Sequence, residues 1–166
     1  MNKKVLMLFL MINIATVLSF AHGADFVIKD YKFTWNVAKA GHIRVQLEKE
    51  IARILVVQSG VGGKLGRISL YPTRAKALGE ILAGAGAYHE KFTKREDSNP
   101  FENVPFGDYR VTFVSDSRGR NFEVRISKKR IFGPTVVMSK DEAMKVSEIL
   151  KKSEEMADFL DRHIRP

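Results

Sequence analysis

Basic residues are the side chains of this sequence whose type and spacing most clearly suggest a chemical role. The chain carries 28 Lys and Arg against 19 Asp and Glu, a formal net charge of +9. Many of these cations stand in stretches that alternate apolar and polar residues, the pattern of a strand with one buried face. If Ile43, Val45 and Ile68 face a core, their polar neighbours must face the other side of the sheet. We therefore expect an open, basic sheet face.

Aromatic residues accompany these cations, with Tyr71 on the expected face and Trp35 close to it. Cations that follow phosphates, together with rings that stack on bases, are the elements of a site for single-stranded nucleic acid. The turns between the strands add further cations. The predicted binding residues are Trp35, Arg44, Lys64, Arg67, Tyr71, Arg110, Arg118, Arg120, Arg125, Lys128, Lys129 and Arg130.

Three other uses of the basic residues remain open from the sequence. The charges can be scattered over a merely soluble basic protein. The face can be buried in a homodimer, because Leu55 and Val57 also point to it. It can also bind an acidic protein, in which case the chain is an interaction module such as an inhibitor or an assembly factor.

Catalytic and metal-binding patterns are missing from the sequence. The absence of cysteine excludes disulfides, thiolate metal sites and a cysteine nucleophile. The glycine-rich run at 59–67 lacks the spacing of a phosphate-binding loop, and Leu65 stands where that loop needs a hydroxyl. The four histidines form no metal-ligand pattern, and no serine has a nucleophile context. We expect a protein that is not an enzyme and needs no cofactor or metal.

The first 23 residues have the pattern of a secretory signal peptide. Lys3 and Lys4 precede an apolar run from Val5 to Ala21, and small residues allow cleavage after Ala21 or Gly23. We expect a secreted or periplasmic protein without stable membrane insertion once the segment is removed. An uncleaved membrane anchor and an organellar transit peptide are the alternatives.

The rest of the sequence has the pattern of an internal repeat, with equivalent positions 68 residues apart. Ala75 and Glu80–Leu82 are identical to Ala143 and Glu148–Leu150, and the apolar positions of the strands keep the same phase. Chance agreement of two amphipathic patterns is the alternative. We expect units at 24–92 and 107–166, joined by a linker at 93–106, which contains Ser98-Asn99-Pro100 and Pro105.

Each unit is predicted to contain three or four strands followed by a helix. The strands are expected at 42–48, 53–59 and 66–71, and at 109–115, 121–127 and 134–138, with a leading strand within Phe26–Asn36. Apolar residues at helical spacing predict helices from Ala75 to Phe92 and from Ser139 to Ile164. Ser139 and Glu142 form a capping box at the start of the second helix. The fold class is therefore α+β, with helices covering antiparallel sheets.

Two segments resemble a known superfamily of single-strand-binding proteins. Residues 63–72 (GKLGRISLYP) resemble the G-K-x-G-I-S-L-x-P segment of the transcriptional positive-coactivator family, with one additional residue before Ile-Ser-Leu. Residues 115–126 (SDSRGRNFEVRI) resemble the E-N-x-R-G-R-F-L-K-I hairpin of PUR repeats, with Asn121 inserted before the phenylalanine. The resemblance, which extends to the Whirly proteins, implies an intertwined pseudo-dimer of two strand-strand-strand-strand-helix units that binds single-stranded DNA or RNA.

Overall fold

Four consecutive strands of the first half pair into an antiparallel sheet in the order β1-β2-β3-β4. These strands are β1 (Lys32–Ala40), β2 (Ile43–Glu50), β3 (Arg53–Gly60) and β4 (Arg67–Leu70). Gly41, with a φ of 57°, provides the left-handed turn between β1 and β2. Each strand therefore pairs with its neighbour in sequence.

The computed structural model describes residues 32–50, 53–60, 66–96, 98–129 and 135–164, with the backbone alone for 53–60 and Ser117. The predicted strands of the first half agree with β2, β3 and β4 within about two residues. The leading strand ends later in the chain than predicted, because β1 continues to Ala40 and the turn at Gly41 ends it. Residues 26–31 of the predicted strand lie outside the described residues.

Two short helices replace the single helix predicted for each half. In the first half α2 (Pro72–Ala83) is followed by α3 (Ala85–Thr93), with a break at Gly84. Pro72 occupies the first turn of α2, where its missing N–H removes no helical hydrogen bond. In the second half α4 (Lys140–Lys151) is followed by α5 (Ser153–His163). The predicted capping box is confirmed, with Ser139 and Glu142 each accepting a backbone N–H of the other.

The second sheet repeats the first, in the order β5-β6-β7-β8. Its strands are β5 (Phe101–Phe106), β6 (Tyr109–Val114), β7 (Glu123–Lys128) and β8 (Thr135–Ser139), with a short 3-10 helix, η1 (Ser117–Gly119), between β6 and β7. The predicted linker at 93–106 is wrong in its second part, since 101–106 is β5. β5 is an edge strand, where proline is tolerated, so Pro105 does not end the pairing.

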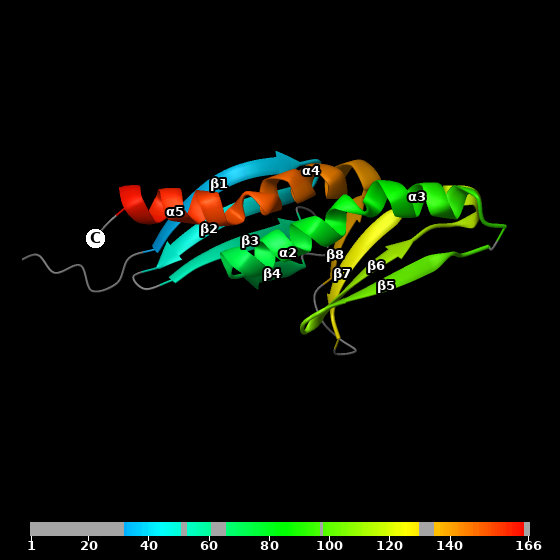
Figure 1. Cartoon of the computed structure of the whole chain (residues 1–166), viewed down its shortest axis with the longest axis horizontal. Helices are drawn as coiled ribbons and strands as arrows, with labels where there is room; N and C mark the ends of the chain where they lie inside the picture. The colour runs from blue at the N-terminus through cyan, green and yellow to red at the C-terminus, as the bar shows by residue number, and fades with distance from the viewer. Residues whose placement is uncertain (1–31, 51–52, 61–65, 97, 130–134, 165–166) are drawn as a thin grey trace, which may run out of the picture. The chain divides into compact units, whose positions relative to one another are not determined.

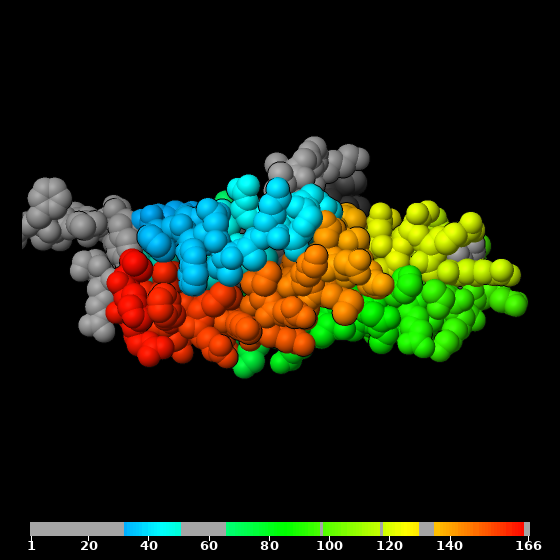
Figure 2. All heavy atoms as spheres, turned by 90° about the horizontal axis from the view of Figure 1, so that it is seen from above, coloured from blue at the N-terminus to red at the C-terminus, as the bar shows by residue number. Residues whose placement is uncertain are grey.

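The helices that end each half cover the sheet of the other half. Figure 1 shows α3 over the second sheet and α5 over the first, and Figure 2 shows the same placement from above. The ring of Tyr88 in α3 stacks on Phe113 of β6, with centroids 4.2 Å apart. Phe159 of α5 contacts Trp35 of β1, with centroids 6.1 Å apart. The two halves are therefore interleaved through their helices.

A single cluster of buried residues lies between the helices and the two sheets. Val45 and Leu47 of the first sheet and Val111 and Phe113 of the second are fully buried in it. Tyr31–Pro166 accordingly form one compact unit. The α+β class with antiparallel sheets is confirmed. Within the described part of the chain, no helix is both long enough and apolar enough to cross a membrane.

Candidate nucleic-acid interface

The open face of the first sheet carries two like charges directly opposite each other. Strand register pairs Lys39 of β1 with Arg44 of β2, and the neighbouring pair Ala40–Ile43 is buried on the helix side. Lys39 and Arg44 therefore point away from the helices, and both are exposed. Neither side chain has an acidic partner among the described residues. This pair concentrates positive charge at one end of the face.

Arg67, at the other edge of this sheet, is bound by a carboxylate. Its Nη2 lies 2.8 and 3.0 Å from the two carboxylate oxygens of Glu48. Glu48 also forms an ion pair with Lys32, at 2.9 Å, and is only 6% exposed. Arg67 is on the open face as predicted, but Glu48 neutralises much of its charge.

The open face of the second sheet carries Arg110 and Arg125. Their alternation with buried Val111, Val124 and Ile126 turns both away from the helices, as predicted. The Nε and Nη2 of Arg125 lie 2.9 and 2.8 Å from Glu123 Oε2. Arg110, in contrast, has no ion-pair partner within the described segments. Among the described residues, this face thus has Arg110 without an ion-pair partner and Arg125 paired with Glu123.

An exposed aromatic ring also belongs to the second open face. Phe101 of β5 lies opposite Val114 in register, in the row that includes Glu123, and is 60% exposed. An exposed aromatic ring on a sheet has a face on which a base of a bound partner can stack. Phe101 was not predicted as a site residue, because it falls in the segment assigned to the linker. The alternation of Phe101, Asn103 and Pro105 with Val104 and Phe106 is the sequence signal for this strand.

Tyr71 is exposed as predicted, whereas the predicted place of Trp35 is wrong. Tyr71 follows β4 at the N-cap of α2, with extended backbone and 56% exposure. Trp35 lies opposite buried Leu47 on the helix side of the sheet, half-buried against Phe159. The strand continues past the predicted boundary at Asn36, and a bulge between Asn36 and Ala38 changes which residues share a face. Trp35 therefore packs with the core.

Arg118 and Arg120 lie in the β6–β7 connection, at the end of the second sheet. Arg118 is exposed and has a φ of 60°, in the left-handed region. The backbone carbonyl of Arg120 accepts hydrogen bonds from Ser115 Oγ at 2.6 Å and from the Asp116 amide at 2.8 Å. A Cβ on Gly119 would lie 2.4 Å from Thr93 Cγ2, so this loop packs against the end of α3. The two arginines are thus separate from the rows of Arg110 and Arg125.

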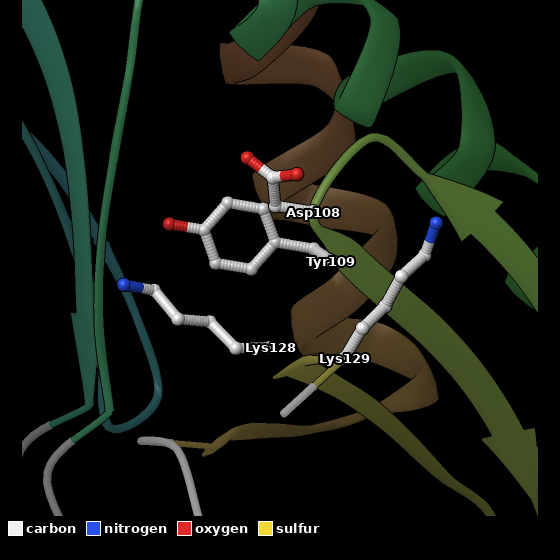
Figure 3. Close-up of a pocket in the computed structure, with 4 residues that line it drawn as sticks. All are labelled: Asp108, Tyr109, Lys128 and Lys129. Atoms are coloured by element: carbon white, nitrogen blue, oxygen red, sulfur yellow. The ribbon is translucent and has the colours of Figure 1, made fainter. Parts of the chain in front are cut away.

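Lys128 and Lys129 line a pocket of about 510 Å³ with Asp108 and Tyr109. Tyr109 and Lys128 are opposite in register, and Figure 3 shows the hydroxyl and the ammonium pointing to the same side. Lys129 points the other way, and its backbone N–H donates to the Asp108 carbonyl at 2.9 Å. Lys128, two residues after buried Ile126, continues the helix-covered side of the sheet beyond its core. The remaining predicted cations, Lys64 and Arg130, lie outside the described residues.

His42 joins the β1–β2 turn to the second half of the chain. Its Nδ1 lies 2.9 Å from Glu142 Oε1, and its Nε2 lies 2.8 Å from the Val137 carbonyl oxygen. Burial alone would raise the pKa of Glu142, but hydrogen bonds from the Ser139 and His42 backbone amides outweigh burial and lower that pKa. This arrangement stabilises the contact between the halves. The described residues contain no group of three metal-binding side chains here or elsewhere.

Lys39 is the second binding candidate that the sequence prediction missed, after Phe101. A strand ending at Asn36 leaves Lys39 in a loop. The signal was the two-residue turn at Gly41 and His42, which places Lys39 opposite Arg44 once β1 is extended to Ala40.

The candidate cations in the described residues thus lie in four places: the open face of each sheet, the β6–β7 connection and the pocket beside Tyr109. This arrangement can bind an anionic chain, and the ring of Phe101 on the second face can stack on a base. No protein-family model matches this chain, and no curated protein matches it.

Proposed function

We propose that this protein is an exported, non-enzymatic protein that binds single-stranded nucleic acid through the open faces of its sheets. The observation that carries the proposal is the second open face, where exposed Phe101 lies on the same side of the sheet as Arg110 and Arg125. A ring can stack on a base while neighbouring guanidinium groups bind phosphates. Duplex DNA hides its bases, so this combination favours a single strand.

The fold that we propose is a pseudo-dimer of the kind found in PUR repeats and Whirly proteins. Helices α2 and α4 begin 68 residues apart, as do α3 and α5, and the two sheets have the same strand order. The contacts are reciprocal, since α2 contacts α5 and α4 contacts α3. Reciprocity of this kind is the property of a two-fold interface. It supports gene duplication over chance agreement of two patterns.

Export is proposed from the sequence of residues 1–23, which lie outside the described residues. A basic start, an apolar run and small residues at two cleavage positions support a secreted or periplasmic location. The protein would then bind nucleic acid outside the cytoplasm.

Binding of an acidic protein is the second candidate function. Arg67 and Arg125 each bind a carboxylate within the chain, at 2.8 Å, and an acidic partner presents the same group. Such a partner would exchange with Glu48 or Glu123, and the chain would then be an interaction module.

Charge-matched double variants test the proposal. Arg110→Gln/Arg125→Gln removes two cations from the open face, and Lys145→Gln/Lys151→Gln removes two exposed cations from α4. Labelled single-stranded and duplex oligonucleotides are titrated at three salt concentrations, with polyglutamate as the acidic control polymer. We expect tighter binding of the single strand than of the duplex or of polyglutamate. The open-face variant should lower the slope of log K against log salt by roughly 1.4, because each phosphate contact on a single strand contributes ~0.7.

The control variant on α4 should leave that slope nearly unchanged. Equal losses in the two variants would mean that only net charge matters. Preference for polyglutamate at equal ionic strength would favour the interaction module instead.

A further inference from the structure

Lys39 and Arg44 are like charges directly opposite each other on neighbouring strands. The other cross-strand pairs described on this face contain no such like charges. Residues directly opposite on antiparallel strands have Cβ atoms about 4.5–5.5 Å apart, and like charges at that distance destabilise the sheet. Elsewhere on the same two strands Lys32 lies opposite Glu50 and pairs with Glu48 at 2.9 Å. The like-charge pair is therefore a local exception on an otherwise charge-balanced face.

The tight turn between β1 and β2 fixes Lys39 and Arg44 as cross-strand neighbours. The turn of Gly41 and His42 connects the strands directly, and Ala40 and Ile43 beside it are buried on the helix side. Lys39 and Arg44 must therefore stand side by side on the open face. Glu142, the carboxylate that contacts this turn, is bound by the amide and ring of His42.

A row of polar positions continues from this pair across the sheet. Arg44 is opposite Ser59 in register, and Ser59 is opposite Arg67. Neighbouring strands are about 4.8 Å apart, so these positions form one row across the four strands, although the guanidinium of Arg67 is turned toward Glu48. A phosphate placed at Lys39 and Arg44 would lie at one end of this row.

We infer that Lys39 and Arg44 form a phosphate-binding pair, in which one phosphate group screens the repulsion between the ammonium and the guanidinium. That this phosphate belongs to a bound single strand rests on the proposed function. Ammonium and guanidinium groups both donate charge-assisted hydrogen bonds to phosphate oxygens. Residues that lower stability without a compensating contact in the chain are expected where a ligand supplies that contact.

The matched variants are Lys39→Gln and Lys32→Gln, which remove the same charge from the same strand and face. Lys39→Gln should raise the thermal midpoint by roughly 1–3 °C, because it relieves the repulsion. It should also weaken single-strand binding about fivefold at 0.1 M salt, the effect of one lost phosphate contact with a slope of ~0.7. Lys32→Gln should lower the midpoint, because buried Glu48 loses a partner, and should leave binding unchanged.

Inorganic phosphate provides a readout that does not depend on nucleic acid. At constant ionic strength, replacing chloride with phosphate should raise the midpoint of the unaltered chain more than that of Lys39→Gln, since a ligand of the folded state stabilises it. If phosphate has this effect and oligonucleotides do not bind, the pair is a phosphate site and the nucleic-acid proposal fails.

The inference is overturned if Lys39→Gln lowers the midpoint, or if Lys39→Gln and Lys32→Gln change affinity and the phosphate effect equally. If the chain still binds oligonucleotides, and Arg110→Gln/Arg125→Gln still weakens that binding, only the inference about Lys39 and Arg44 fails. The proposed function is then unaffected.

Discussion

Ser147 of α4 donates a buried hydrogen bond of 2.7 Å from its Oγ to the carbonyl oxygen of Gly79 in α2. These two residues are 68 positions apart, the offset at which the sequence repeats. Equivalent positions of two repeats meet each other only on the axis that relates them. The crossing of α2 and α4 at Gly79 and Ser147 is therefore where we place the pseudo-two-fold axis of the proposed pseudo-dimer.

Gly79→Ala should destabilise the protein by about 1–2 kcal/mol, although alanine is the better helix former. A Cβ on Gly79 would lie 2.9 Å from the Lys151 amide nitrogen and 3.0 Å from the Ser147 carbonyl oxygen. Both are backbone atoms of α4, which can move away only if the helices separate. Urea unfolding of the variant and the unaltered chain measures the effect.

Gly86→Ala is the matched control for this helix crossing. Its Cβ would meet only Met144 Sδ, at 3.8 Å, which is ordinary contact. The control should stabilise the protein by about 0.4–1 kcal/mol through the lower entropy of the unfolded chain. Stabilisation by both alanines would contradict a close helix crossing at Gly79.

Glu142→Gln should lower stability at neutral pH by about 1–2 kcal/mol, because the carboxylate accepts the His42 and Ser139 amides with its two oxygens and glutamine has only one acceptor oxygen. Because the pKa of Glu142 is lowered in the folded state, its ionised form stabilises the fold above its unfolded pKa, near 4.5. That contribution is lost as the pH falls through the lower, folded pKa. The difference in unfolding free energy between variant and unaltered chain should therefore be constant above about pH 5 and shrink below it.

Urea unfolding at several pH values checks this dependence. Glu90→Gln is the control, since the pKa of Glu90 is lowered by the hydrogen bond and charge of exposed Lys94 alone. Its effect on stability should be small and should fade with added salt. A pH-independent loss in Glu142→Gln would mean that the carboxylate acts only through packing.

Phe101→Ala should weaken single-strand binding by ~1–3 kcal/mol and leave the salt dependence nearly unchanged, because a stacked ring releases no counterions. Titration at three salt concentrations separates these two quantities. Phe159→Ala is the control, since that ring is 49% exposed but lies on α5 against Trp35. Similar losses in both variants would argue against stacking on the open face.

Trp35→Ala should lower stability by roughly 1–3 kcal/mol and spare binding, because the indole packs with Phe159 on the helix side. Unfolding gives the stability, and titration well below the thermal midpoint gives the affinity. A loss of affinity without a loss of stability would mean that Trp35 belongs to the binding site.

Much of the local structure follows from sequence alone. The alternation of Ile43, Val45 and Leu47 with polar residues predicts which side of β2 is buried, because side chains of a strand alternate between two faces. The capping box of Ser139 and Glu142 predicts where α4 begins, because both hydrogen bonds form within one turn. Such signals are local, so they do not depend on the rest of the fold.

Tertiary structure determines which residues pack against each face or bind its side chains. The apolar stripe of α3 predicts burial, yet nothing in its periodicity says that Tyr88 will stack on Phe113 of the other sheet. The sequence places Arg67 on the open face, but the buried carboxylate of Glu48 that binds it comes from a strand two positions away in the sheet. Hydrophobic burial is non-directional, so a pattern determines which face is covered, and only the packing of distant segments determines what covers it.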